Sequence, residues 1–185
     1  MSGTVAYQGV RGAFGEEACR LFLPDLKPVP LPTFAAVAEA VARGETGRGM
    51  LPRRNSTAGP VPGIDALMEE KGLEVQASHV LPVRLHLLAR PGVTLEAVRS
   101  VVSHPMALAQ CARTLERLGL ATEEAANTAM AARAVAESDD SGRAAVASEF
   151  AAEAWGLAIL MGDVHDRADN ATTFCVVTRR NGESR

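Results

Sequence analysis

The sequence predicts an α/β fold whose sheets contain mostly parallel strands. Short apolar segments alternate along the whole chain with longer segments of helical periodicity. Several of the expected strands run through small or hydroxyl residues directly into a helix, which is the order found in parallel α/β units. The strands are expected at residues 4–7, 27–31, 49–52, 73–83, 85–89, 100–103, 144–147 and 173–178.

Capping and helix-breaking residues place the helices between these strands. Pro24 ends a first helix, Thr33 caps a second that Gly44 stops, and Pro105 begins a long one. The helices are expected at residues 16–22, 34–43, 64–70, 105–118, 128–136 and 149–155, with a short one from 94. Residues 53–59 are expected to form a polar loop, and residues 179–185 a frayed tail.

Composition excludes several classes of function. The chain has 185 residues, of which 47% are hydrophobic and 22% charged, with a net charge of -3. The absence of a basic run argues against nucleic-acid binding, and no apolar run reaches the length of a membrane span. The start of the sequence does not resemble a signal peptide. Three widely spaced cysteines are expected to be buried free thiols of a cytoplasmic protein.

Four segments at strand ends are candidates for binding a small carboxylate. Backbone N–H groups at a helix start attract anions, and strand ends form ligand crevices in α/β sheets. The alternative is that these residues only cap helices and form turns. The segments are Gly9 to Gly15, Asn55 to Gly59, Ser103 to Pro105, and Ser148.

The four histidines have no paired metal-ligand spacing, so no metal site is expected. No P-loop and no dinucleotide fingerprint are present, and no nucleophilic triad can be assembled from spacing.

Six blocks in order resemble the motifs of the prephenate dehydratase family. The central ones resemble its Pro-Ile-Glu-Asn-Ser segment, its Ser-His-Pro helix and its closing Asn-x-Thr-Arg-Phe motif. The blocks are Tyr7 to Phe14, Leu51 to Gly59, Ser103 to Cys111, Asn127 to Ala132, Ala144 to Leu157, and Asp169 to Phe174.

The resemblance implies two α/β lobes with mixed, mostly parallel sheets, similar to type II periplasmic binding proteins. One lobe would hold about residues 1–77 and 163–185, the other about 78–162, with the active site in the cleft between them. The sequence ends where the family's ACT regulatory domain would begin, so no phenylalanine feedback through such a domain is expected.

The resemblance also implies an activity: the conversion of prephenate to phenylpyruvate, water and carbon dioxide, without a cofactor or metal. Thr172 stands at the position of the catalytic threonine, where its hydroxyl would donate a hydrogen bond to the leaving oxygen. The substrate would be bound by Asn55, Ser56, Thr57, Ser103, Thr173 and Phe174. Phe174 would pack against the substrate ring; the alternative is that it belongs to the core.

Two departures from the motifs concern charge. Thr173 replaces the motif arginine, a loss that could cost about 2 to 4 kcal/mol of binding to a substrate carboxylate. Arg53 and Arg54 stand where the family has Ile-Glu. Either one reaches the substrate and replaces the missing charge, or both are solvated.

The functional hypotheses are therefore three. The first is a prephenate dehydratase, weakened by Thr173. The second is a catalytically silent anion-binding module on the same fold, and the third is a paralogue that acts only with a partner chain. The resemblance to the family also implies a homodimer, and a cytoplasmic location is expected.

Overall fold

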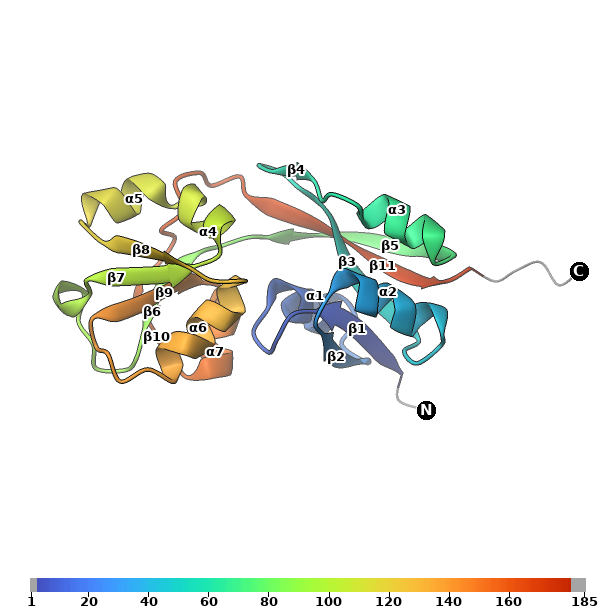
Figure 1. Cartoon of the computed structure of the whole chain (residues 1–185), viewed down its shortest axis with the longest axis horizontal. Helices are drawn as coiled ribbons and strands as arrows, with labels where there is room; N and C mark the ends of the chain where they lie inside the picture. The colour runs from blue at the N-terminus through green and yellow to red at the C-terminus, as the bar shows by residue number, and fades with distance from the viewer. Residues whose placement is uncertain (1–2, 181–185) are drawn as a thin grey trace, which may run out of the picture. The chain divides into compact units, whose positions relative to one another are not determined.

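The computed structural model describes residues 3–180, which divide into two compact units (Figure 1). Unit 1 holds Gly15–Pro82 together with the chain up to Val10 and from Asp169. Unit 2 holds Arg11–Phe14 and Val83–Ala168. The boundaries fall later than the expected 77 and 163, because strand β5 continues to Pro82 and pairs there with the first residue of β11.

Unit 1 is built on a mixed sheet with the strand order β2-β1-β3-β11-β5, to which β4 adds beside β3. Its strands are β1 (Thr4–Gln8), β2 (Lys27–Leu31), β3 (Arg48–Asn55), β4 (Gly59–Pro60), β5 (Leu73–Pro82) and β11 (Ala171–Arg179). Its helices are α1 (Phe14–Phe22), α2 (Phe34–Ala42) and α3 (Ile64–Glu70).

Alternating residues of β11 face opposite sides of this sheet. Cys175 and Val177 belong to the core that α2 and α3 cover. Phe174 pairs with His79, whose ring stacks on Phe22 of α1 at 4.4 Å between ring centroids. Since side chains alternate along a strand, the even-numbered residues at this end of β11 share the face of α1.

Unit 2 has a second mixed sheet with the order β10-β6-β9-β7-β8. Its elements are β6 (His86–Ala89), a 3-10 helix (Leu95–Ala97), β7 (Ser100–Ser103), α4 (Pro105–Gln110), α5 (Ala112–Arg117), β8 (Ala121–Glu124), α6 (Thr128–Ala136), β9 (Arg143–Ala147), α7 (Glu149–Trp155) and β10 (Ala158–Met161).

Helices cover both faces of the sheet in unit 2 (Figure 1). Ala144 and Val146 of β9 pack in the core on the side of α4 and α5. Their neighbours Ala145 and Ala147 pack on α6 and α7. A strand that is buried on both faces reads as a continuous apolar run, which is why the sequence identified β9 so clearly.

Both sheets are mixed, as expected, but parallel pairs do not predominate. Among the strand pairs of residues 3–180, four are parallel and five are antiparallel. The long strand β11 is antiparallel to both of its neighbours, because the chain enters unit 1 again from the opposite direction. The alternation of strands and helices in the sequence does not predict that β11 runs antiparallel to its neighbours.

The expected helix of residues 105–118 is interrupted at Cys111. Asp166 explains the break, because its carboxylate accepts hydrogen bonds from the N–H groups of Arg113 and Thr114, at 3.0 and 3.2 Å. A side chain far along the chain thus caps the start of α5. All three cysteines are free and buried, as predicted, and burial raises the pKa of Cys19 and Cys111 to about 12.

We expect His86 to make the stability of the protein depend on pH. Its side chain is 4% exposed, and Nδ1 accepts a hydrogen bond from the Asp163 N–H at 3.1 Å. Burial holds the pKa of His86 below its usual value, so the unfolded chain binds a proton that the folded one excludes. The stabilisation is full above the ordinary histidine pKa of about 6.5 and is lost as the pH falls below it.

The measurement is urea unfolding at about pH 7.5 and 5.5 for the wild type and for His86→Gln, a variant that cannot titrate in this range. The wild type should lose more free energy of unfolding on acidification than the variant. Equal losses would show that His86 does not contribute.

Candidate functional site

Asn55 closes the end of strand β3. Its Oδ1 accepts hydrogen bonds from Thr57 N at 2.9 Å, Thr57 Oγ1 at 2.7 Å and Ala58 N at 2.9 Å. An asparagine that binds the backbone two and three residues ahead forms a turn of this kind. The turn leads into β4 and not into a helix, so the expected loop of residues 53–59 is corrected to the end of β3 and a tight turn.

The other side of the Asn55 amide contacts the start of β11. Asn55 Nδ2 lies 2.9 Å from Asn170 Oδ1, 3.2 Å from Ala171 O and 3.1 Å from Thr172 Oγ1. These residues meet because β3 and β11 are antiparallel neighbours, with Asn55 opposite Thr172. We call Asn55, Asn170 and Thr172 the amide–hydroxyl cluster. It joins two motifs that the sequence analysis had matched separately.

Ser56 has a structural role in holding the same two segments together. Its Oγ donates to Asp169 O at 2.7 Å and accepts from Ala171 N at 2.9 Å. Its backbone N–H donates to Ala171 O at 2.8 Å. The hydroxyl proton of Ser56 is therefore used within the protein, and the same holds for Thr57, which donates to Asn55.

Thr172 differs from these hydroxyls. Its Oγ1 accepts from Asn55, and within residues 3–180 no protein group accepts the Thr172 O–H. The side chain is only partly buried. A threonine hydroxyl has one proton, so Thr172 can donate it to a bound molecule while its oxygen is held by Asn55.

The other predicted residues of the closing motif do not join the cluster. Thr173 pairs with Arg54, and both lie on the face of α2 and α3, opposite the face of Thr172. Arg53 donates to Asp65 of α3 at 2.9 Å. Phe174 is 4% exposed and belongs to the interior, as the alternative interpretation had it.

We expect Arg53→Ala and Arg54→Ala each to leave the KM for a bound carboxylate substrate within about threefold of the wild type. Both arginines are exposed, and an exposed charge contributes less than about 1 kcal/mol. Steady-state kinetics of the two single variants, with the exposed Arg43→Ala as a surface control, is the measurement. A tenfold or larger rise in KM for one of them would mean that this arginine reaches the substrate.

In unit 2 the residues singled out at strand ends act mainly as caps. Ser103 is fully buried, and its Oγ donates to Val146 O within the sheet at 2.6 Å. The His104 Nδ1 accepts from Met106 N, and the Ser148 Oγ accepts from Ala151 N. The structure therefore gives Ser103 a partner inside unit 2, and its contact with substrate stays a prediction.

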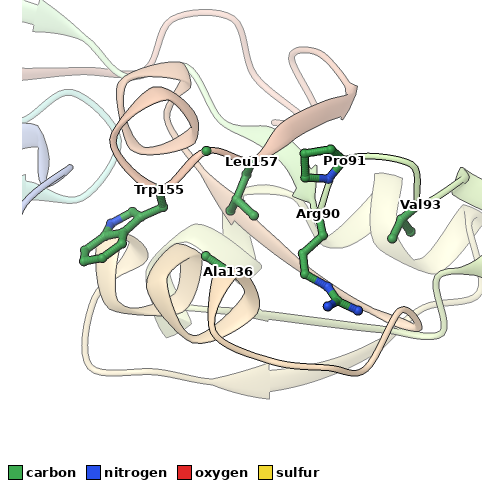
Figure 2. A pocket seen from close by; sticks show the side chains of 7 residues that line it. Arg90, Pro91, Val93, Ala136, Trp155 and Leu157 are labelled. Carbon is green, nitrogen blue, oxygen red and sulfur yellow. The ribbon is translucent and has the colours of Figure 1, made fainter.

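A hollow of about 410 Å³ lies at the ends of α6 and α7 (Figure 2). It contains none of the predicted site residues, and its two polar side chains already donate to protein carbonyls. Arg90 Nη2 donates to Asp139 O at 2.9 Å, and Trp155 Nε1 donates to Arg11 O at 3.0 Å. Within residues 3–180, no group of three His, Cys, Asp or Glu side chains could hold a metal ion.

Asn170 is the residue that the sequence analysis did not select. It is 4% exposed, and a buried amide in a polar motif is a signal of a hydrogen-bonding role. It lies in the closing motif two residues before Thr172.

Comparison with known proteins shows the family of the chain. A model of the family described as prephenate dehydratase matches residues 5–182. A relative from Arabidopsis thaliana, named arogenate dehydratase/prephenate dehydratase 2, chloroplastic, is 43% identical over 95% of this chain and 46% of its own length. A protein of Komagataeibacter europaeus named bifunctional N-acyl-homoserine lactone acylase/prephenate dehydratase is 40% identical over 95% of this chain and 63% of its own. The chain thus spans about half to two thirds of these relatives.

Solved structures give the same result. The prephenate dehydratase of Arthrobacter aurescens superposes with a TM-score of 0.87 at 29% identity, over 97% of this chain and 61% of that one. The methionine-binding protein MetQ shares the fold alone, with a TM-score of 0.51 at 13% identity over 96% of this chain and 82% of its own. The fold is therefore α/β and similar to that of periplasmic binding proteins, and the chain belongs to the prephenate dehydratase family.

Proposed function

We propose that this chain is a dehydratase that converts prephenate to phenylpyruvate, with Thr172 as the catalytic residue. The carboxylate on the ring leaves as carbon dioxide, and the electron pair of that bond completes the aromatic ring. The ring hydroxyl departs on the other side of the ring and leaves as water after taking up a proton. Aromatisation drives the reaction, so the protein has to orient the substrate and stabilise the departing oxygen.

The observation that carries the proposal is the hydroxyl of Thr172. Asn55 donates a hydrogen bond to the Thr172 oxygen, and the Thr172 hydroxyl proton has no acceptor within residues 3–180. Threonine is too weak an acid to give up its proton fully, so its contribution is a hydrogen bond that strengthens as charge develops on the leaving oxygen.

The substrate is tested by offering two compounds to the purified protein. Phenylpyruvate formed from prephenate is followed by its absorbance, and phenylalanine formed from arogenate, a substrate named for several relatives, by chromatography. We expect prephenate to be converted. Conversion of arogenate alone would keep the dehydratase chemistry but change the substrate, and conversion of neither would contradict the proposal.

The second candidate is a catalytically silent anion-binding module. Thr173 at the position of the motif arginine is the observation that favours it, because a threonine cannot form a charged pair with a carboxylate. Such a module would bind prephenate and return it unchanged. An acylase activity, which the K. europaeus relative carries in its name, is checked with an N-acyl-homoserine lactone in the same preparation.

The location and assembly of the protein stay predictions. No helix within residues 3–180 is long and apolar enough to cross a membrane. The A. thaliana relative is named as chloroplastic, so the expected cytoplasmic location is open to test by fractionation, and the expected homodimer by sedimentation.

A further inference from the structure

We infer that Asn170 is a positioning residue for catalysis, which sets the direction of the hydrogen bonds in the amide–hydroxyl cluster. The inference rests on the proposed function, because Asn170 acts through Thr172. It assigns a role to a residue that touches neither the reacting atoms nor the substrate in the proposed mechanism.

The direction of each hydrogen bond follows from the backbone. Two backbone N–H groups, those of Thr57 and Ala58, point to one atom of the Asn55 amide at 2.9 Å each. A backbone N–H can only donate, so that atom is the oxygen of the amide and the opposite atom is the nitrogen. The orientation of Asn55 is thus fixed by groups that cannot change their own role.

The fixed orientation of Asn55 also sets the direction of the hydrogen bonds to its neighbours. Asn55 Nδ2 is a donor, so the atom of Asn170 that lies 2.9 Å away must be the amide oxygen. For the same reason Thr172 Oγ1, at 3.1 Å, accepts and does not donate towards Asn55. The hydroxyl proton of Thr172 is consequently directed away from the cluster.

Asn170 is needed to hold the Asn55 side-chain nitrogen, which has two protons to donate, in a fixed position. One proton is held by the Asn170 oxygen, which leaves the other for Thr172 Oγ1 and Ala171 O. Asn170 is buried, so water does not replace its oxygen readily. Removing that oxygen frees the Asn55 nitrogen to move and loosens its hold on Thr172. An accepted hydrogen bond also makes a hydroxyl a better donor, and that effect would be lost as well.

The test compares Asn170→Leu, which removes the oxygen at similar branching, with Asn170→Asp, which keeps it. In the prephenate assay, Asn170→Leu should lower kcat by about 10- to 100-fold and change KM less than about threefold. Asn170→Asp should keep most of kcat and raise KM, because its charge repels an anionic substrate. Thr33→Ala, which removes a helix cap of α2 in the same unit, controls for a loss of stability without a change in kcat.

A double-mutant cycle separates positioning from a structural role. In a Thr172→Val background, Asn170→Leu should have no further effect on kcat, since the hydroxyl that it positions is absent. A further loss of the same size as in the wild type would overturn the inference, and so would an unchanged kcat in the single Asn170→Leu variant.

A second readout does not depend on activity. The side-chain amide signals of Asn55 in ¹⁵N-labelled protein should shift in Thr172→Val and in Asn170→Leu, and should not shift in Thr33→Ala. Unshifted signals in an active enzyme would refute the hydrogen-bond relay and leave the proposed function intact. Shifted signals in a protein that converts neither prephenate nor arogenate would refute the proposed function, and the positioning role of Asn170 with it.

Discussion

Thr172→Val should lower the kcat for prephenate by about 100-fold or more, while the protein keeps its fold and binds substrate with similar affinity. Valine matches the shape of threonine and is favourable in a strand, so β11 should form as before. What is lost is the hydrogen bond to the leaving oxygen, and removal of one such donor from an active site costs about two to three orders of magnitude. Steady-state kinetics, with thermal unfolding as the check on folding, is the measurement.

Thr178→Val provides a matched control in the same strand. The Thr178 Oγ1 is buried and has no hydrogen-bond partner within residues 3–180, so its replacement removes an uncompensated polar group. We expect an unchanged kcat and an equal or slightly higher unfolding temperature. If both valine variants kept full activity, Thr172 would not be the catalytic residue.

Asn55→Asp should abolish most of the turnover by reversing one hydrogen bond. The aspartate can still accept from Thr57 N and Ala58 N, so the turn after β3 should be retained. Its second oxygen cannot donate, and Thr172 would then give its hydroxyl proton to the carboxylate. We expect a fall in kcat of at least about tenfold, with that of Thr172→Val as the upper bound.

The comparison with Asn55→Ala completes this experiment. Alanine removes the acceptor for the turn as well as the donor to Thr172, so it should lower both kcat and the unfolding temperature. Asn55→Asp should lower kcat with a smaller loss of stability. An aspartate variant with the activity of the wild type would show that the donor function of Asn55 is not needed.

The sequence predicted most helices and strands correctly because their local signals agree with their tertiary setting. Residues 128–136 and 149–155 are helices with those bounds, and each begins after an asparagine or serine whose side chain caps it. The strand β8 was not predicted, because its four residues are all exposed and mostly polar. Its pairing with β7 is a tertiary contact that no local pattern reports.

The candidate site was predicted only in part, and the reason is distance along the chain. The residues Asn55 and Thr172 were both selected from motifs, but their contact depends on the pairing of β3 with β11. The opposite faces of Thr172 and Thr173 follow from strand geometry, which separates neighbours in sequence to the two sides of a sheet. The role of Asn170 follows from the directions of four hydrogen bonds around the Asn55 amide, and these depend on tertiary contacts that no local pattern contains.

The most direct test of the proposed dehydratase activity is to measure binding and conversion of prephenate in one calorimetric experiment on the wild-type protein. After titration, the contents of the cell are analysed for phenylpyruvate. The account predicts a heat of binding followed by sustained heat of reaction, with phenylpyruvate in place of the added prephenate. Binding heat alone, with no loss of prephenate beyond its spontaneous decay, would contradict the proposed conversion of prephenate.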